Sequence, residues 1–398
     1  MVPARNVVSM SVRAILLTLL VTAGVARTQP VLDPGQIQKL IPILQPARGE
    51  RALACDVSVI KPSLNYSFRF QAGYSVSVPM SLYEGSGHAL AILLSVTPDG
   101  GGKPVYLGNH MLLPAIPKTK NDLNFTGAYL LGIGSYTVNW VMTDDSERVC
   151  RKTWRVDVKL AHSERDVQLT IPAGMVTDLS ARGLRRYRPP VDDSRPLRLT
   201  VLMHAAPMSP RRTHMRSSDT MTLVSSLSSL LEHLPTVSVR LVVFNLDQQK
   251  ELYRKEGFTL RSMNQVFSTI NEMQLSLVDV QVLGNRRGYV DMISDMVNQE
   301  IRSQPPSDAV VFLGPTARLE DKIPRESLEA VAGEAPRFFY FQVRPFFGGG
   351  RGGPVPPAVN GYLPDSINSA MSRLNGKVIV IHSPGDLAKA ITRLEHLN

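Results

Sequence analysis

The sequence predicts two domains of different fold class: an all-β sandwich, followed by an α/β domain with a doubly wound, mainly parallel sheet. A chain of 398 residues is too long for one ordinary hydrophobic core, which favours two domains. Between residues 51 and 160, short alternating apolar runs are separated by Gly, Pro, Asn and Asp, as is typical of antiparallel strands. From residue 197 onward, continuous apolar runs alternate with helical stripes, which indicates parallel strands covered on both faces.

Residues 1–26 have the layout of a secretory signal peptide. Arg5 and Arg13 precede an apolar stretch over residues 14–23, and small residues follow it. The alternative is an uncleaved membrane anchor, but the stretch falls short of the ~20 apolar residues that span a bilayer. We therefore expect cleavage, export to the periplasm or the extracellular space, and a mature chain that is not an integral membrane protein. Residues 27–50 are expected to be a loosely ordered lead-in segment.

Cys55 and Cys150 are the only cysteines of the chain. Export places them in an oxidising compartment, where a disulfide persists, so we expect them to pair. In the chain-entropy description, closing a loop of about 95 residues stabilises a domain by roughly 4 kcal/mol. A zinc cluster and thioredoxin-like chemistry are not expected, because the sequence has neither a paired metal-ligand spacing nor a Cys-x-x-Cys motif.

The chain is basic, with a formal net charge of +10, of which the two arginines of the signal peptide supply part. A basic surface attracts polyanions. For an exported protein these are cell-wall polymers, lipid headgroups or extracellular nucleic acid, whereas genomic nucleic acid is out of reach. The densest basic cluster is interrupted by one aromatic residue, Tyr187, which gives little support for stacking on single strands, so we interpret it as a solvated linker. The cluster comprises Arg182, Arg185, Arg186 and Arg188.

The first domain is expected over residues 51–160. Tyr136, Val138, Trp140 and Met142 alternate with polar residues, so one face of that strand is expected to be buried. The expected strands cover residues 66–70, 74–78, 89–96, 105–107, 128–131, 136–143 and 153–158.

The segment Gly134-Ser-Tyr136-Thr-Val138 resembles the tyrosine corner of immunoglobulin-like domains. Val138 stands where antibody domains carry their second cysteine. The resemblance implies an immunoglobulin-like sandwich, although the positions of the two cysteines do not match the antibody-type disulfide between sheets. A generic β-sandwich with a buried Tyr and Trp is the alternative.

Residues 161–196 combine charges with three prolines and are expected to link the domains. The second domain is expected over residues 197–398. Its helix near Ser218 has a stripe of buried leucines, the pair Ser262 and Gln265 has the spacing of a capping box, and Ser383 is expected to cap the last helix. The expected strands cover residues 197–203, 237–245, 251–260, 308–313, 338–343 and 377–381, with helices from about 218, over 262–270 and 289–301, and near 325–332, 364–374 and 384–396.

The order of these elements resembles the von Willebrand factor A-like domain in the form found in exported bacterial proteins. The landmarks are the strand over residues 239–244, a helix start at Asp291, and a final strand over residues 376–381 that leads into Asp386. The resemblance spans about half of the chain. It implies that ligands bind at the carboxyl ends of the parallel strands.

Members of this family usually hold a divalent cation there through an Asp-x-Ser-x-Ser sequence, a Thr and a further Asp, because Mg²⁺ prefers hard oxygen ligands. This sequence departs from each position. Met203 stands in place of the first Asp, and Ala205 and Pro207 stand in place of the two Ser. Arg287 stands in place of the Thr, and the segment 314–316 replaces Thr-Asp-Gly. The resemblance therefore predicts a degenerate site that binds no metal, and no cofactor is expected.

Three residues are candidates for binding. Arg287 either marks an inactive remnant of the metal site or meets an acidic side chain of the partner. His204 follows a strand end, where open α/β sheets place their ligands, but it can equally be structural. Phe346, just before a glycine-rich loop over residues 348–353, is either an exposed apolar tip or packed beneath that loop.

The sequence contains no Gly-x-Ser-x-Gly elbow, no phosphate-binding loop and no His-Glu-x-x-His zinc helix. We therefore expect a non-enzymatic binding module for protein–protein interaction or adhesion, with a partner in the cell envelope or extracellular space. Two alternatives remain. One is a hydrolase that uses His204 with Asp291 or Ser209, which must then lie within hydrogen-bonding reach. The other is a binder of polyanions such as cell-wall polymers, whose affinity would fall steeply with salt.

Overall fold

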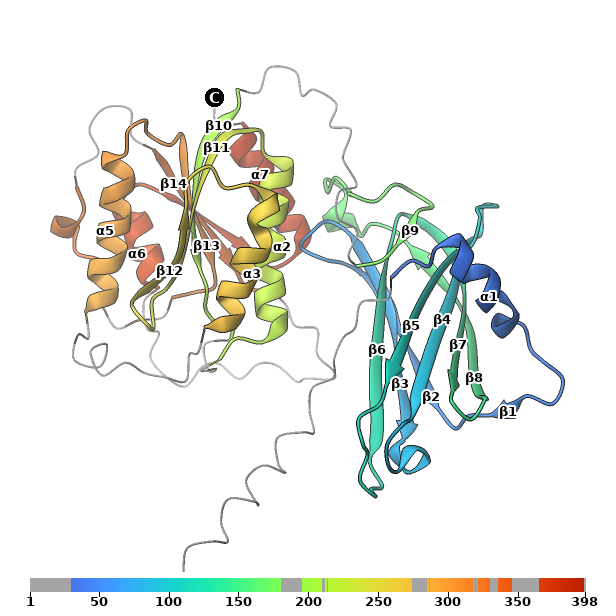
Figure 1. Cartoon of the computed structure of the whole chain (residues 1–398). Coiled ribbons are helices and arrows are strands. Elements are labelled where there is room, and N and C mark those ends of the chain that lie inside the picture. The colour runs from blue at the N-terminus through green and yellow to red at the C-terminus, as the bar shows by residue number, and fades with distance from the viewer. Residues whose placement is uncertain are drawn as a thin grey trace, which may run out of the picture. The chain divides into compact units, whose positions relative to one another are not determined.

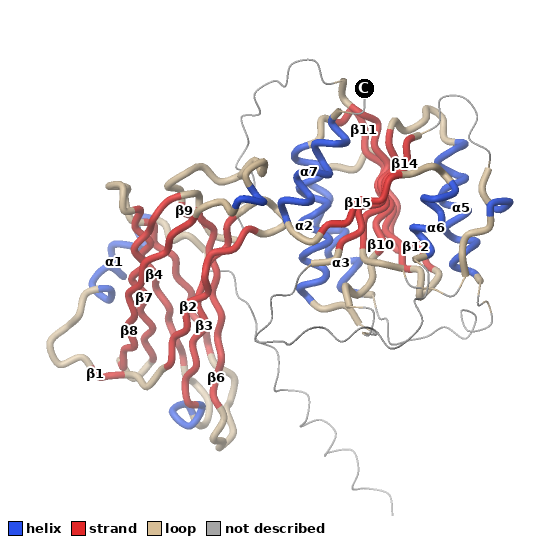
Figure 2. The backbone as a smooth tube through the Cα atoms, turned by 180° about the vertical axis from the view of Figure 1, so that it is seen from behind, coloured by secondary structure: helices blue, strands red, loops and turns tan. Residues whose placement is uncertain are grey.

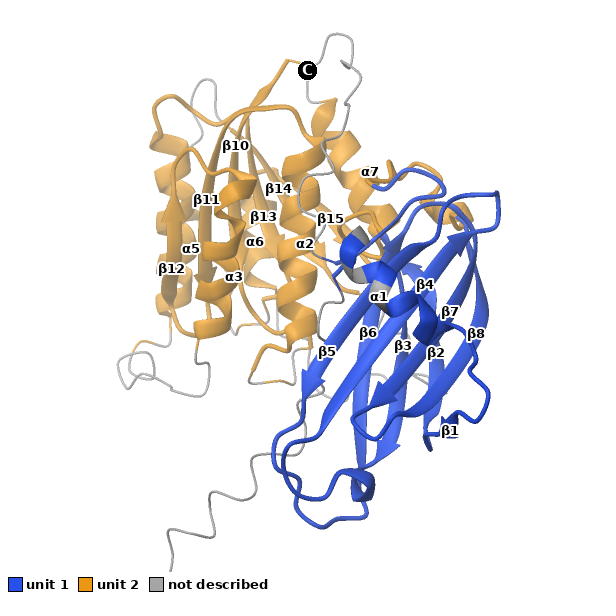
Figure 3. Ribbon diagram, turned by 45° about the vertical axis from the view of Figure 1, so that its right-hand side comes forward, with its two compact units in different colours: residues 1–63, 70–159, 171–184 blue, residues 64–69, 160–170, 185–398 orange. Residues whose placement is uncertain are grey.

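The chain divides into two compact units, which Figure 3 shows in different colours. Unit 1 comprises residues 1–63, 70–159 and 171–184, and unit 2 comprises residues 64–69, 160–170 and 185–398. The expected signal peptide and the arginine cluster of the linker lie outside the described residues. The computed structural model describes residues 30–179, 195–209, 212, 214–273, 285, 287–317, 319, 321–329, 336–345 and 365–396.

Unit 1 contains two sheets, with the strand orders β1-β8-β7-β4-β5 and β2-β3-β6-β9. The pairings of β7 with β8, β4 with β7, β4 with β5 and β3 with β6 are antiparallel, whereas β1 runs parallel to β8. The elements are α1 (Pro34–Leu44), β1 (Arg51–Ala52), β2 (Asp56–Leu64), β3 (Phe70–Pro79), β4 (Ala89–Pro98), β5 (Val105–Leu112), β6 (Asp122–Leu131), β7 (Gly134–Asp144), β8 (Arg148–Val158) and β9 (Val176–Thr177).

The predicted alternation along β7 is confirmed. Tyr136, Val138, Trp140 and Met142 are all at most 1% exposed, because every second side chain of a strand points to the same face. Trp140 contacts Tyr74 of β3 edge to face, with ring centroids 5.3 Å apart, which joins the inner faces of the two sheets. The Tyr136 hydroxyl donates a hydrogen bond to the Gly132 carbonyl, 2.8 Å away.

The strand predicted over residues 66–70 is wrong except for its last residue. The Asn65 side chain accepts hydrogen bonds from the backbone N–H groups of Ser67 and Arg69, and this local closure competes with a strand. Phe68 has φ of 55°, in the left-handed region that an extended strand does not use. Residues 65–69 therefore form a turn, and β3 begins at Phe70.

The predicted disulfide between Cys55 and Cys150 is present, with Cα atoms 6.4 Å apart. Cys55 directly precedes β2, and Cys150 lies within β8. The bond thus joins the start of one sheet to a strand of the other, across 95 residues of chain.

Unit 2 contains the predicted parallel sheet, with the strand order β12-β11-β10-β13-β14-β15. All neighbours are parallel except the edge strand β12, which is antiparallel to β11. The strands are β10 (Leu197–His204), β11 (Thr236–Asn245), β12 (Lys250–Lys255), β13 (Ala309–Gly314), β14 (Arg337–Val343) and β15 (Lys377–Ile381). The α-helices described in this unit are α2 (Ser217–His233), α3 (Met263–Glu272), α5 (Gly288–Arg302), α6 (Ser366–Arg373) and α7 (Pro384–Glu395).

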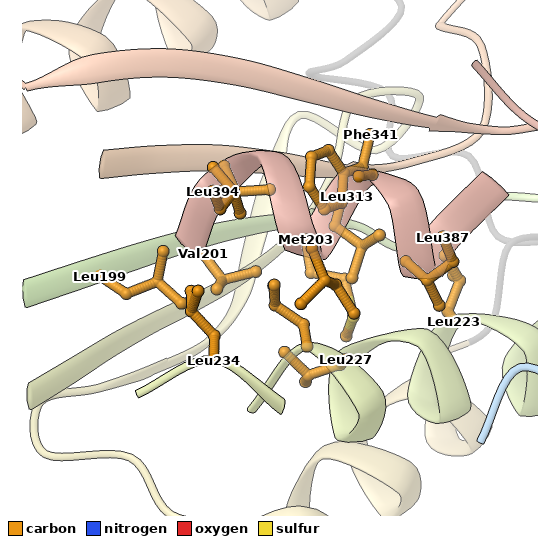
Figure 4. Packing of buried hydrophobic residues seen from close by; sticks show 14 of the residues in the cluster. Leu199, Val201, Met203, Leu223, Leu227, Leu234, Leu313, Phe341, Leu387 and Leu394 are labelled. Carbon is orange, nitrogen blue, oxygen red and sulfur yellow. The ribbon is translucent and has the colours of Figure 1, made fainter. Parts of the chain in front are cut away.

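Helices cover both faces of this sheet (Figures 1 and 2). One core lies under α2, α3 and α7, and the second lies under α5 and α6. Figure 4 shows the first of these cores, where Val201 and Met203 of β10 pack among Leu223 and Leu227 of α2 and Leu394 of α7. Successive residues of β10 point to opposite faces, so a strand buried on both sides must be apolar throughout.

Of the two helix caps predicted for unit 2, one is confirmed and one is wrong. Ser383 caps α7 as predicted, since its hydroxyl accepts from the Asp386 N–H while the Asp386 carboxylate accepts from the Ser383 N–H. The capping box predicted for Ser262 and Gln265 is wrong. The Ser262 hydroxyl accepts from Lys255 Nζ, 2.7 Å away, and the Gln265 amide oxygen accepts from Tyr253, so tertiary contacts take both side chains.

The helix predicted near residues 325–332 is only a short 3₁₀ turn, Arg325–Ser327, as far as the described residues extend. The Ser327 hydroxyl donates to the Pro324 carbonyl and accepts from Ser294 of α5, so it closes the turn locally and ties it to a neighbouring helix. Of the helices in the described part of the chain, none is long and apolar enough to cross a membrane.

Candidate functional site

The carboxyl edge of the sheet in unit 2 is the candidate site. In open α/β sheets, ligands bind beyond the carboxyl ends of the strands. The parallel strands β10, β11, β13, β14 and β15 end together at this edge, and polar side chains lie at the strand ends and in the segments that follow them. We refer to these residues as the carboxyl-edge cluster: His204, Asn245, Arg287, Asp321, Gln342, Arg344 and Asp365.

His204, the last residue of β10, is a buried aromatic group of this edge. His204 is only 3% exposed, and its ring stacks on the ring of Phe244 in β11, with the two centroids 5.3 Å apart. A Cβ at Gly314 would lie 2.7 Å from the His204 carbonyl oxygen, so the end of β13 approaches this residue closely. Among the described residues, neither ring nitrogen of His204 has a hydrogen-bond partner.

The imidazole of His204 is held neutral. Burial lowers the pKa of His204 from 6.5 to about 4, because the protonated ring loses its hydration. Two weaker influences oppose this effect: the Asp247 carboxylate, and the Pro315 carbonyl, whose geometry toward the ring falls short of a hydrogen bond. A neutral, unpaired and buried imidazole is a packing group in this state, without a positioned acid or hydroxyl with which to exchange a proton.

This burial predicts a pH-dependent stability. Because the pKa of His204 is lower in the folded state than in the unfolded state, the unfolded chain binds the proton first as the pH falls. Stability is intact above pH 6.5 and is lost progressively between pH 6.5 and about 4, up to roughly 3 kcal/mol. His204→Phe removes the titrating group, so urea unfolding of this variant is expected to show a weaker pH dependence over that window. His214→Phe, at an exposed position of the same unit, is the matched control, and an equal effect of both substitutions would contradict the assignment.

Asn245 joins the end of β10 to the turn after β11. Its side-chain N–H₂ donates to the Ala205 carbonyl, 2.6 Å away, and its oxygen accepts from the Gln248 N–H at 2.7 Å. In the same turn, the Gln249 side chain donates to the Asn285 carbonyl, directly before α5. A Cβ at Gly288 would lie 1.9 Å from the Gln249 side-chain oxygen, so a larger residue at the start of α5 would displace the Gln249 side chain from its present position.

Arg287 is an exposed cation at the start of α5. It is the N-cap residue of that helix, and its carbonyl accepts from the Val290 N–H at 2.8 Å. Its side chain is 63% exposed, and Nε lies 3.9 Å from an Asp321 carboxylate oxygen. The same oxygen accepts from the Tyr289 hydroxyl, 3.1 Å away, which fixes Asp321. An ion pair this long and this exposed contributes little to stability, so the guanidinium remains available to another acidic group.

Asp365, by contrast, accepts hydrogen bonds from its own chain. It caps α6, where one carboxylate oxygen accepts from the Ile367 and Asn368 N–H groups. The other oxygen accepts from the Gln342 side chain at 2.5 Å and from the Tyr340 hydroxyl at 3.3 Å. Burial raises the pKa of Asp365 above its usual value, although these donors act in the opposite direction. The single proton of the Tyr340 hydroxyl has a closer acceptor in the Pro315 carbonyl, 2.7 Å away, so the firm donors to Asp365 are Gln342, Ile367 and Asn368, and the carboxylate stabilises the edge.

Arg344, the residue after β14, is a second exposed cation of the edge. Its Nε donates to the Thr316 hydroxyl, 2.9 Å away, and its carbonyl lies 2.8 Å from His382 Nδ1. The contacts hold the Arg344 backbone and one edge of its guanidinium. The remaining N–H groups of the Arg344 guanidinium can donate hydrogen bonds to a carboxylate.

His204 is not paired with either of the residues that the hydrolase hypothesis requires, as far as the structure is described. Among the described residues, neither Asp291 nor Ser209 is hydrogen-bonded to His204, so the pair that an acid–base mechanism needs is not formed. Met203 and Ala205 are fully buried, and Pro207 is buried beside them. No group of three or more potential metal-ligating residues occurs in the part of the chain that the structure describes.

Several cluster residues were missed by sequence reasoning. Gln342 is a polar side chain near the end of a mainly apolar strand, and Asp365 lies at the start of a predicted helix, so each carried a weak signal. Asn245 and Arg344 directly follow or end strands, where the position alone marks candidate site residues. Phe346, the third predicted binding residue, lies outside the described residues.

Comparisons with known proteins give no assignment. No family model matches the chain, and no curated protein matches it. Among solved structures, the putative ApaA protein from Bordetella pertussis is 10% identical, with 28% of this chain and 99% of that chain covered and a TM-score of 0.20. A hypothetical protein from Pyrococcus horikoshii is also 10% identical, with 28% and 93% covered and a TM-score of 0.20.

A beta-glucuronidase from Bacteroides uniformis is 6% identical, with 73% of this chain and 36% of that chain covered and a TM-score of 0.19. TM-scores this low carry no argument about the fold or the function of this chain.

Proposed function

We propose that this chain is an exported, non-enzymatic binding protein that contacts a protein of the cell envelope or extracellular space without a divalent cation. The observation that carries this proposal is the composition of the carboxyl edge. Met203 and Ala205, which by the proposed family alignment fill positions of oxygen ligands, are buried, while Arg287 holds an exposed positive charge at the start of α5. A fixed guanidinium can bind a partner carboxylate directly, where a metal ion would otherwise bridge two acidic groups.

The fold proposals that accompany this function are a von Willebrand A-like unit 2 and an immunoglobulin-like sandwich in unit 1. A mainly parallel six-stranded sheet with one antiparallel edge strand and helices on both faces supports the first. The hydrogen bond from Tyr136 to the backbone four residues upstream supports the second, because it has the geometry of a tyrosine corner. Export is proposed from the signal-like residues 1–26, and the disulfide supports it.

Arg287 and Arg344 are the groups proposed to meet the partner. Both are exposed, both extend from residues that backbone hydrogen bonds fix, and both keep guanidinium N–H groups that no other described residue binds in a close hydrogen bond. Bidentate pairing with a carboxylate is the contact that the planar guanidinium favours. The preferred partner surface is therefore acidic.

Arg287→Glu is expected to reduce partner binding about tenfold, because it replaces an attraction by a like-charge contact at the centre of the proposed surface. We would express tagged wild-type and variant chains in the native host, cross-link intact cells with a short amine-independent photoreagent, and quantify the adduct. The adduct of the wild-type chain is expected to persist in EDTA.

Arg302→Glu is the matched control for this experiment. Arg302 ends the same helix at the opposite edge of the sheet, its side chain is 67% exposed against 63% for Arg287, and it likewise pairs with one carboxylate, that of Glu329. The variant is expected to retain the wild-type adduct. Loss of the adduct in EDTA, or equal losses in the two variants, would contradict a cation-free contact at Arg287.

A further inference from the structure

A basic groove lies at the amino edge of the same sheet, where β14 and β15 begin and α7 ends. Its volume is about 660 Å³. Phe339 and Ile379 supply apolar side chains, and the polar residues that line it include Arg337, Lys377, Arg393 and His396. We refer to these six residues as the basic groove.

Two cations of the basic groove have no carboxylate partner among the described residues. No carboxylate belongs to its lining. Lys377 and Arg393 are exposed, and neither forms an ion pair with another described residue. Adjacent unpaired cations beside a buried aromatic ring, that of Phe339 at 2% exposed, favour an anionic ligand with some apolar character.

The strand beside this groove, β15, is the outermost strand of the sheet. No described strand pairs with its outer side. Side chains alternate along a strand, so Lys377 and Ile379 lie on the α7 face and Val378 and Val380 on the other, while Val378 also contributes to the lining of the groove. Val378 is 36% exposed and Val380 is 38% exposed, so as far as the described residues extend, β15 presents an unpaired backbone edge flanked by cations on one face and by valines on the other.

The other edge of the sheet differs from β15. Strand β12 carries the sequence Lys-Glu-Leu-Tyr-Arg-Lys, and its Glu251 and Arg254 form an ion pair with each other. Charged side chains of this kind protect an edge strand from pairing with another chain. β15, with the sequence Lys-Val-Ile-Val-Ile, has one charge at its first residue and lacks this protection along its remaining length.

We propose that an extended acidic segment of a partner protein adds to β15 as a further strand. The geometry defines the pattern of that segment: acidic side chains at alternate positions face Lys377 and Arg393, and apolar side chains at the positions between them cover Val378 and Val380. Main-chain hydrogen bonds to the free edge supply affinity that does not depend on sequence, and the two faces supply specificity.

A second copy of this chain fits β15 less well than an acidic segment. Edge-to-edge pairing of two β15 strands would cover the exposed valines but would bring no carboxylate to Lys377 and Arg393, because β15 contains no acidic residue. An acidic polysaccharide could pair with Lys377 and Arg393, but it would not form strand hydrogen bonds with the backbone edge or cover the exposed valines. The proposal concerns the amino edge and does not depend on binding at Arg287.

The test is fluorescence anisotropy with the mature full-length chain and a labelled peptide of alternating Val and Glu that spans the five residues of β15. Saturable binding is expected. A peptide of the same composition with its Val and Glu residues in separate blocks, and a peptide with N-methylated backbone amides at alternate positions, are both expected to bind at least tenfold more weakly. Lys377→Glu/Arg393→Glu is expected to weaken binding of the alternating peptide about tenfold.

Lys250→Glu/Arg373→Glu is the matched control, with the same charge change at exposed positions of β12 and α6. This variant is expected to bind the alternating peptide as the wild type does, and far-UV circular dichroism of both variants checks folding. Equal affinity for the block and alternating peptides would show a polyanion surface and overturn strand addition. Absence of binding to the alternating peptide, or equal losses in the two double variants, would also overturn it.

Discussion

Arg240→Met is expected to lower the free energy of unfolding of unit 2 by about 3–5 kcal/mol, because it leaves a buried carboxylate without its counter-ion. Glu300 of α5 is 1% exposed, and its Oε2 accepts from Arg240 Nη1 at 2.7 Å and from the Thr200 hydroxyl at 2.8 Å. The Arg240 guanidinium also donates to the Ser303 hydroxyl. Met preserves the length of the apolar stem, so the effect isolates the lost charge.

Arg254→Met is the control for this substitution, since Arg254 pairs with Glu251 near the surface of the neighbouring edge strand. Exposed pairs of this kind contribute about 0–1 kcal/mol. The measurement is urea unfolding followed by far-UV circular dichroism, because all but one of the described α-helices belong to unit 2. Adding Glu300→Leu to Arg240→Met is expected to recover most of the loss. Equal effects of Arg240→Met and Arg254→Met would contradict the buried ion pair.

Removal of the disulfide is expected to have a comparable effect on unit 1. Cys55→Ser/Cys150→Ser opens a loop whose ends are 95 residues apart, which frees the unfolded chain and costs about 4 kcal/mol of stability in the chain-entropy description. The native contacts of β1 and β2 with the rest of unit 1 remain, so the variant is expected to fold at low temperature and to unfold at lower urea concentration.

Tryptophan fluorescence measures this effect selectively, because both tryptophans of the chain, Trp140 and Trp154, lie in unit 1. A reductant is expected to shift the fluorescence transition of the wild-type chain toward that of the double variant, and to leave the transition of the double variant in place. The helical signal of unit 2 is expected to change little. A fluorescence transition that neither the reductant nor the substitutions shift would contradict a stabilising disulfide.

The strands and helices of unit 2 were easier to predict than the turns and loops, because in unit 2 the residues that recur with a regular sequence period are also the buried ones. The core strands contain long apolar runs, and the leucines of α2 recur on one face, as expected for a helix packed against a sheet. Strand β2, by contrast, has mainly exposed residues and no regular alternation, so its sequence carried no strand signal. Its pairing with β3 is a tertiary effect, which local pattern cannot reveal.

The candidate site was predictable only in its location. The carboxyl ends of parallel strands meet at one edge, so His204 and Arg287 could be placed there from sequence order. The contacts of Asp365 with Gln342 and Tyr340 could not be predicted, because they join segments that are separated in sequence by loops without a periodic pattern. The capping box at Ser262 failed for the same reason, since a distant lysine competes for the hydroxyl.

The central claim is that the carboxyl edge of unit 2 acts without a divalent cation, and calorimetric titration of the mature chain with Mn²⁺ tests it most directly. The account predicts no saturable heat up to millimolar Mn²⁺, with a cation-binding domain of the same proposed family as the positive control. Saturable binding of one Mn²⁺ per chain that disappears in Asp321→Asn would contradict the account, because it would place a working cation site beside Arg287.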